Sequence, residues 1–199
     1  MFSSTLDMYK KPLQKYYDDY TTNVSTSDMA ISLEMATFLN FVISTRKPSS
    51  ILDLGSGFSS FVFRKFSDTQ TKIYSVDDNQ EWLNKTKDYL TVNEIRNDKL
   101  FTWDEFKGES LDFKFDLIFH DLGNMKTRQK ALDDVLSFFN ESGVIIFDDI
   151  HKIDYYRAVE DFNLKNNLFF KSVQYLTLDG FGRYAGIAYK NIEQEGKIL

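Results

Sequence analysis

The sequence predicts an α/β domain with a doubly wound, mostly parallel sheet of seven strands that closes with a C-terminal antiparallel hairpin. Three observations lead to this fold class. Short apolar runs alternate with segments of helical periodicity, the order typical of a parallel sheet covered by helices. The first run ends in a glycine turn, and the last two runs, over residues 169–178 and 184–189, have the spacing of a β-hairpin.

The composition is that of an ordinary globular domain. The chain has 199 residues, of which 42% are hydrophobic and 27% charged, so it is long enough to bury one substantial core. The net charge of −6 argues against a general nucleic-acid partner, because binding phosphates requires a basic face. Without cysteine, neither a disulfide nor a thiolate metal site is available.

No segment of the sequence predicts membrane association. Uncharged apolar runs are too short to span a bilayer, and the polar, tyrosine-rich start lacks the apolar stretch of a signal peptide. We therefore expect a cytoplasmic protein that binds no membrane and is a monomer or a homodimer.

Residues 1–26 differ from the rest of the chain and are expected to form an N-terminal arm. Their lysine-tyrosine clusters favour either a helix that packs across the domain or a lid over a substrate pocket. Residues 27–199 are expected to form one domain. Thr26 or Ser27 is expected to cap its first helix, in which apolar residues recur on one face: Ile31, Met35, Phe38, Leu39 and Val42.

Strands and helices are expected to alternate after this first helix. Apolar runs predict five strands, over residues 51–54, 73–77, 99–101, 115–121 and 143–149. The intervening segments predict helices. The first begins near Ser59 or Ser60 and the second at the capping-box spacing of residues 78–81, and the later ones cover residues 127–139 and 152–163. Because the strands run in the same direction, their carboxyl ends meet at one edge of the sheet, where this fold class binds ligands.

The most informative stretch is Asp53-Leu54-Gly55-Ser56-Gly57, at the end of the first expected strand. Glycines at a strand-to-helix turn let the backbone come close to a ligand, and the free N–H groups of the helix start favour its polar part. Asp77 ends the second strand, where a doubly wound sheet has the carboxylate that binds ribose hydroxyls. Strand, turn and acid together predict a nucleotide-like cofactor.

This stretch resembles the first motif of the class I, Rossmann-like methyltransferases that use S-adenosylmethionine (SAM) and release S-adenosylhomocysteine. The resemblance covers residues 27–190 and implies their seven-stranded sheet. It implies that Asp53 lies near the methionine end of the cofactor, that the glycines approach the cofactor and that Asp77 holds its ribose. The candidate cofactor-binding residues are Asp53, Gly55, Ser56, Gly57, Asp77, Asp78, Trp103, Asp104 and Asp121, with Trp103 or Asp104 at the adenine.

Polar residues also follow the fourth and fifth expected strands: His120, Asp121, Asp148, Asp149 and His151. Such groups at the ends of apolar strands cost stability unless something pairs with them, such as a metal ion, a cationic sulfonium or a substrate proton. Asp121, Asp148 and Asp149 resemble the metal site of the O-methyltransferases of the catechol and caffeoyl-coenzyme A type. That resemblance implies a divalent cation, Mg²⁺ or another metal, held by these three residues.

Methyl transfer requires an acceptor atom aligned behind the methyl carbon and removal of its proton. His120 or His151 is the candidate catalytic base, because imidazole titrates near neutrality, and Asp121 or Asp148 would orient this base or the substrate. With a metal, the ion would instead lower the pKa of the substrate hydroxyl. The metal-dependent enzymes have a lysine base three residues after the first aspartate, and this sequence has Asn124 there.

We therefore expect a SAM-dependent methyltransferase that acts on a small-molecule acceptor at oxygen, with no nucleic-acid substrate. Two alternatives stay open. A NAD(P)-binding oxidoreductase would use a similar scaffold, but Ser60 replaces the third glycine of the dinucleotide fingerprint. A non-catalytic SAM-binding accessory module would keep the fold, because one fold carries many functions, and its carboxylates and histidines would tolerate alanine.

Overall fold

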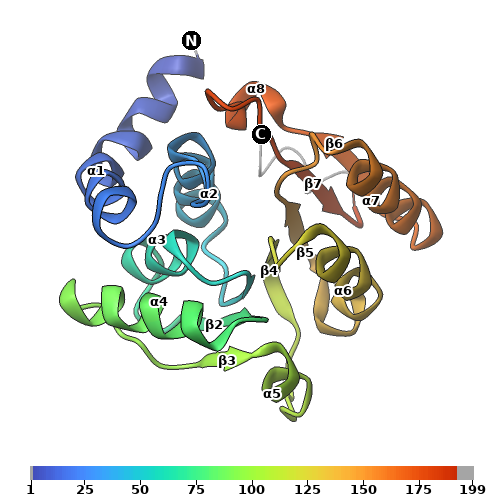
Figure 1. Cartoon of the computed structure of the whole chain (residues 1–199). Coiled ribbons are helices and arrows are strands. Elements are labelled where there is room, and N and C mark those ends of the chain that lie inside the picture. Colours follow the sequence, from blue (N-terminus) through green and yellow to red (C-terminus); the bar gives the residue numbers. More distant parts are fainter. Residues whose placement is uncertain (1, 192–199) are drawn as a thin grey trace.

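The computed structural model describes residues 2–191, so residues 192–199 of the expected domain lie outside the described part. The strands are β1 Ser50–Leu54, β2 Lys72–Asp77, β3 Leu100–Thr102, β4 Phe115–His120, β5 Phe139–Phe147, β6 Phe169–Ser172 and β7 Gly186–Tyr189. The helices are α1 Phe2–Asn23, α2 Leu33–Arg46, α3 Phe58–Phe66, α4 Gln80–Val92, α5 Trp103–Lys107, α6 Met125–Phe138, α7 Ile153–Lys165 and α8 Gln174–Thr177 (Figure 1).

The seven strands form one sheet in the order β3-β2-β1-β4-β5-β7-β6. All neighbouring pairs are parallel except those of β7, which is inserted antiparallel between β5 and β6. This arrangement confirms the predicted doubly wound, mostly parallel sheet with an antiparallel C-terminal pair. The strand order reverses between β1 and β4, and ligands bind at the carboxyl edge of such a switch point.

Helices cover both faces of the sheet, α1 to α4 on one side and α5 to α7 on the other (Figure 1). Successive side chains of a strand point to opposite faces. Along β4, Leu117 and Phe119 therefore belong to the core under α2 and α3, whereas Ile118 belongs to the core under α6 and α7. Both cores are built from buried apolar side chains, so the sheet that carries the carboxyl edge is packed on both faces.

Helix α1 is part of the first core. Leu13 and Tyr20 are buried, and the backbone carbonyl of Tyr16 accepts a hydrogen bond from the Tyr89 hydroxyl at 2.9 Å. This packing agrees with the expectation of an arm that lies across the domain. Residues 24–32, which we call the α1–α2 linker, follow this helix. The division at residue 26 and the role of the arm as a lid stay predictions.

Two helix starts differ from the predicted ones. Helix α2 is capped by Ser32, whose Oγ accepts from the Met35 N–H at 3.0 Å, and not by Thr26 or Ser27. The carbonyl of Thr26 closes a turn with the Ala30 N–H instead, so the chain reverses before the helix begins. Helix α4 is capped by Asn79 rather than through a capping box at 78–81, since the Asn79 amide oxygen accepts from the Trp82 N–H.

Two short helices replace segments that were expected to be irregular or extended. Residues 103–107 form α5, because Thr102 and Glu105 make a reciprocal capping box at its start. Residues 174–177 form α8 and end the expected strand 169–178 at Ser172. Among residues 2–191, no helix combines the length and apolarity needed to cross a membrane.

Candidate active site

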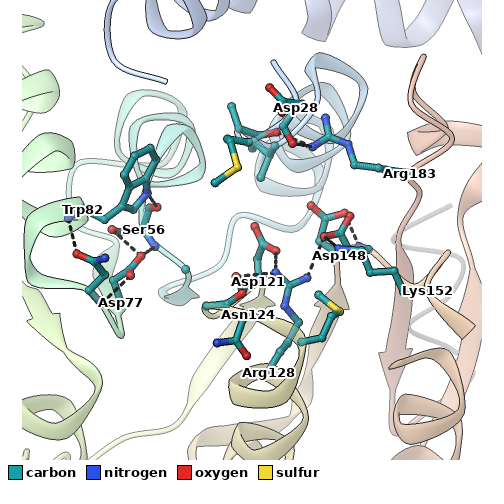
Figure 2. Close-up of a pocket in the computed structure, with 18 of the residues that line it drawn as sticks. Asp28, Ser56, Asp77, Trp82, Asp121, Asn124, Arg128, Asp148, Lys152 and Arg183 are labelled. Carbon is teal, nitrogen blue, oxygen red and sulfur yellow. Dashed lines mark hydrogen bonds and ion pairs between the residues drawn. The ribbon is translucent and has the colours of Figure 1, made fainter. Parts of the chain in front are cut away.

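A cavity of about 550 Å³ opens at the carboxyl edge of the sheet (Figure 2), a volume in the range of small-molecule sites. Its glycine-loop end is lined by Gly55, Ser56, Asp77, Asn79 and Trp82. Its carboxylate end is lined by Asp121, Arg128, Asp148, Asp149, His151 and Lys152. The α1–α2 linker and Arg183 border the same space, as Figure 2 shows for Asp28 and Arg183. Residues from the first, second, fourth and fifth strand ends therefore meet in one cavity.

Gly55 makes the close approach of β1 and β4 possible. Its φ of 106° lies in the region that side chains disfavour. A Cβ atom here would also collide with the backbone carbonyl of Asp121. The Asp121 N–H in turn donates to the Leu54 carbonyl at 2.7 Å, so the glycine turn is fastened directly to the end of β4.

Asp77 holds the glycine loop from the end of β2. Its Oδ2 atom accepts from the Ser56 N–H at 2.8 Å and from the Ser56 hydroxyl at 3.0 Å, and its Oδ1 atom accepts from the Asn79 N–H. Burial raises the pKa of Asp77 to about 6, against the lowering effect of these hydrogen bonds. Asp77 lines the cavity, as expected of a ribose-binding acid.

Asp53 lies beneath the loop rather than among the residues that line the cavity. It is fully buried and accepts hydrogen bonds from three hydroxyls, those of Ser59, Ser60 and Ser75, at 2.5 to 2.8 Å. Burial raises the pKa of Asp53 to about 6, and the three hydroxyls and Arg64 oppose that rise. Asp53 thus fixes the first turn of α3 to β2 and shapes the loop from below.

The other predicted cofactor residues, apart from Asp121, are not among the residues that line the cavity. The Asp78 carboxylate packs against Gly123, where an added Cβ atom would collide with it. Trp103 is stacked on Phe106 and Asp104 is exposed in an ion pair with Lys107 at 3.0 Å. Gly57 is the N-cap of α3. A contact of Trp103 or Asp104 with adenine stays a prediction.

At the carboxylate end the central residue is Arg128 of α6, which is 4% exposed. Its guanidinium lies 2.5 Å from Asp121 Oδ1 and 3.3 Å from Asp149 Oδ2, and it donates to the backbone carbonyls of Asp121 and Gly123 (Figure 2). Within residues 2–191, no group of three or more histidine, cysteine, aspartate or glutamate side chains has a geometry that could hold a metal ion.

The pKa values of the three aspartates of this end are shifted in different directions, each for a physical reason. Burial, together with the Asp149 carboxylate, raises the pKa of Asp148 to about 6. Burial also raises the pKa of Asp121, and the Arg128 guanidinium opposes that rise. Burial acts in the same direction on Asp149, but Arg128, Lys152 and His151 together hold the pKa of Asp149 below its usual value. Of these three aspartates, Asp149 is therefore the one whose charged form is favoured by its surroundings.

The two histidines lie in different surroundings. His120 is fully buried, and its Nδ1 atom is 2.6 Å from the Tyr155 hydroxyl; burial lowers the pKa of His120 to about 3. His151 lines the cavity with a side chain that is 25% exposed, and burial lowers its pKa more mildly. His151 can therefore meet a substrate, whereas His120 is enclosed by the second core.

Arg183 attaches the α1–α2 linker to the rest of the site. Its guanidinium donates to the backbone carbonyls of Ser27, Asp28 and Ala30 at 2.9 to 3.0 Å and pairs with Asp179 at 2.6 Å. The turn of residues 179–183 thereby holds the linker at the rim of the cavity. Met29 of the linker is 71% exposed and also lines the cavity.

Trp82 and Arg128 line this cavity without having been predicted as site residues, and Arg183 was expected only as part of the turn 179–183 that shapes the pocket. Trp82 reads as an apolar helix residue, yet its Nε1 donates to the Ser56 carbonyl at 2.7 Å. Its position three residues after a helix cap, next to the glycine loop, was an available signal. Arg128 and Arg183 have nearby acids, Asp121 and Asp179, but nothing in the sequence indicates their contacts with Asp149 or with the backbone carbonyls of the α1–α2 linker.

Comparisons with known proteins agree with this architecture. The model of a protein family described as O-methyltransferase matches residues 3–169. Among curated proteins, no significant match was found. An O-methyltransferase from Bacillus cereus, solved in complex with S-adenosylhomocysteine, has a TM-score of 0.67 at 17% identity, with 93% of this chain and 89% of that chain covered.

Two further solved structures are similar. The O-methyltransferase TomG of Streptomyces achromogenes, in complex with SAM, has a TM-score of 0.67 at 14% identity and covers 92% of this chain and 88% of its own. The methyltransferase PaMTH1 of Podospora anserina, bound to S-adenosylhomocysteine, has a TM-score of 0.65 at 17% identity, with 96% of both chains covered. At such identities these neighbours establish the fold.

Sheet order and glycine loop define a class I methyltransferase fold, and the family match extends over most of the chain. The chain belongs to the O-methyltransferase family. The prediction of a SAM-dependent methyltransferase that acts at oxygen is confirmed at this level, and the NAD(P) alternative has no support from the family match.

Proposed function

We propose that this chain methylates a hydroxyl group of a small molecule bound at the carboxylate end of the cavity, with His151 as the base. One observation carries the proposal: a single cavity joins the glycine loop and Asp77 to Asp149 and His151. The acidic net charge and the limited volume support a small-molecule acceptor rather than a nucleic acid. A monomeric or dimeric, cytoplasmic state remains an expectation from the sequence.

The glycine-loop end fits a nucleoside cofactor. Gly55 and Ser56 present backbone at the cavity, and Asp77 Oδ1, which accepts from the Asn79 N–H, keeps a further lone pair for a ribose hydroxyl. Trp82 adds an aromatic wall beside Ser56. When bound here, SAM supplies a methyl group already activated by its sulfonium, so the protein must orient the acceptor and remove its proton.

His151 has the environment of a base for this proton. Its Nδ1 atom lies 3.5 Å from Asp149 Oδ1, and neither atom has a hydrogen-bond partner within the described residues. Because burial lowers the pKa of His151, its imidazole is neutral at neutral pH and free to accept a proton. The charged Asp149 carboxylate would then stabilise the imidazolium.

The proposal is tested first by cofactor binding. Calorimetric titration should give a micromolar affinity of the wild type for SAM. Asp77→Ala should bind SAM about tenfold or more weakly, because a ribose acceptor is removed. Asp88→Ala, an exposed acid on α4, is the matched control and should bind normally. Absence of SAM binding to the wild type would contradict the proposal.

Turnover is tested by mass spectrometry. A panel of phenols, catechols and aliphatic alcohols is incubated with SAM, and S-adenosylhomocysteine and methylated product are quantified together. Product that forms with the wild type and falls in His151→Gln supports the proposed function. Cofactor binding without methylation of any acceptor, together with tolerance of alanine at Asp149 and His151, would favour the accessory-module alternative.

A further inference from the structure

The carboxylate end already contains a cation, and it belongs to the chain itself. The Arg128 guanidinium lies between the side chains of Asp121 and Asp149, at 2.5 and 3.3 Å from their oxygens. Those are two of the three carboxylates that a divalent ion would need. Arg128 further donates to the carbonyls of Asp121 and Gly123 and lies against the Tyr155 ring, 5.6 Å from its centroid.

We propose that Arg128 occupies the position of a divalent cation at this site, so that the chain binds SAM and its acceptor without a metal. The proposal rests on the proposed function for the reaction itself, but the claim about metal binding does not depend on it. Arg128 acts as a positioning residue, because it fastens the loop after β4 to Asp149, which in turn faces His151.

The geometry disfavours an additional metal. Mg²⁺ requires oxygen ligands that converge at about 2.0–2.1 Å in an octahedron, whereas here the guanidinium separates the Asp121 and Asp149 carboxylates. Two of the carboxylate oxygens have further partners: Asp148 Oδ1 accepts from the Asp149 N–H at 2.8 Å, and Asp149 Oδ2, already paired with Arg128, lies 3.2 Å from Lys152 Nζ. A metal would have to displace a buried guanidinium and leave its charge unpaired, which is costly.

The local sequence explains how Arg128 reaches this position. Asn124 caps α6, with its amide oxygen accepting from the N–H groups of Lys126 and Thr127 at 3.0 and 3.1 Å. Arg128 follows one helical turn later on the same side of the helix, and its side chain points back at the loop after β4. Asn124, which stands where the metal-dependent O-methyltransferases have a lysine base, is thus the helix cap of α6.

The experiment measures Mn²⁺ binding directly, by electron paramagnetic resonance of free Mn²⁺ during titration of the wild type, Arg128→Gln and Arg128→Lys. The wild type and Arg128→Lys should show no saturable binding, because each keeps a cation among the carboxylates. Arg128→Gln should bind Mn²⁺ saturably, with an affinity at least about tenfold above the upper limit that the wild-type titration sets, because affinity for divalent cations increases with uncompensated ligand charge. Arg157→Ala, an exposed arginine on α7, is the control and should behave as the wild type.

SAM is titrated into the wild type with excess EDTA and with Mg²⁺, and the affinities should agree within about twofold. Saturable Mn²⁺ binding by the wild type, or SAM binding that requires a divalent ion, overturns the inference. So does a folded Arg128→Gln protein that binds Mn²⁺ no better than Arg128→Lys. The wild-type titrations decide the matter even if both variants misfold. A wild type that binds neither SAM nor Mn²⁺ would contradict the proposed function while leaving intact the claim that Arg128 occupies the position of a divalent cation.

Discussion

The two ends of the cavity achieve their shape by different means. At the glycine-loop end the carboxylates of Asp53 and Asp77 are paired with hydroxyls and backbone N–H groups that lie within one strand-turn-helix unit and its neighbour. At the carboxylate end the charges of Asp121 and Asp149 are balanced by Arg128, which comes from another helix. The first end therefore depends on backbone conformation and neutral hydrogen-bond donors, and the second on the pairing of opposite charges.

The largest effect on cofactor binding should follow from Gly55→Ala, which tests the glycine-loop end. The added Cβ atom would meet the Asp121 carbonyl, and the φ of 106° strains any side chain, so we expect a loss of stability of about 1 kcal/mol or more and loss of measurable SAM binding. Urea unfolding and calorimetry measure both. Gly180→Ala is the control, because no heavy atom lies within 4 Å of its Cβ position. Normal SAM binding by Gly55→Ala would show that the loop is not rigid.

The two histidines test which imidazole acts as the base at the carboxylate end of the cavity. His151→Gln should lower turnover by about 100-fold with little change in stability, as expected for loss of a general base. His120→Phe should instead cost about 1–3 kcal/mol, because it leaves the buried Tyr155 hydroxyl without its partner. Turnover and thermal unfolding are measured on both. The reverse pattern, an active His151→Gln and an inactive but stable His120→Phe, would assign the base to His120.

A pH dependence should reveal the raised pKa of Asp53, the more deeply buried of the two acids at the glycine-loop end. The folded pKa of Asp53, about 6, is above the ordinary 3.8, so the protonated form is favoured in the folded state. Its contribution to stability is complete below pH 3.8 and is lost as the pH rises through 6, a decrease of about 3 kcal/mol in the free energy of unfolding.

Chemical denaturation between pH 4 and 7 measures this slope, and Asp53→Asn should flatten it by that amount relative to the wild type. Asp88→Asn, an exposed acid, should leave the slope unchanged. An unaltered slope in Asp53→Asn would mean that its three hydroxyl partners keep Asp53 charged throughout.

The smallest effect is expected at the rim. Arg183→Ala removes the hydrogen bonds to the α1–α2 linker and should raise the KM for the acceptor roughly fivefold, equivalent to about 1 kcal/mol. SAM affinity should change by less than about twofold, because Arg183 lies across the cavity from Asp77 (Figure 2). Arg157→Ala again serves as the control. An equal loss of SAM affinity would indicate that the linker contacts both ends.

Much of the fold could be predicted because its signals are local. Apolar runs of the observed strand lengths, and the glycine turn after β1, specify a parallel sheet without knowledge of any partner. Helix starts were predicted less well, since Ser32 and not Thr26 caps α2. Several polar residues in a row can each serve as a cap, and the packing of the chain decides between them.

The histidines illustrate the same limit within the site. Both follow apolar runs and look equivalent in the sequence, but His120 is still in β4, where side chains alternate between faces. It shares the face of Ile118 and therefore points into the core under α7, at Tyr155. His151 lies beyond the end of β5 and faces the cavity.

The sequence by itself determined the sheet, the glycine loop and Asp77, because each depends on residues a few positions apart or on the regular alternation of strands and helices. Only the tertiary structure decided that Arg128 neutralises Asp121 and Asp149, and that Arg183 holds the linker over the cavity. Charge pairs form between whichever side chains the packing of distant elements brings within a few ångströms, and no local pattern in the chain encodes that proximity.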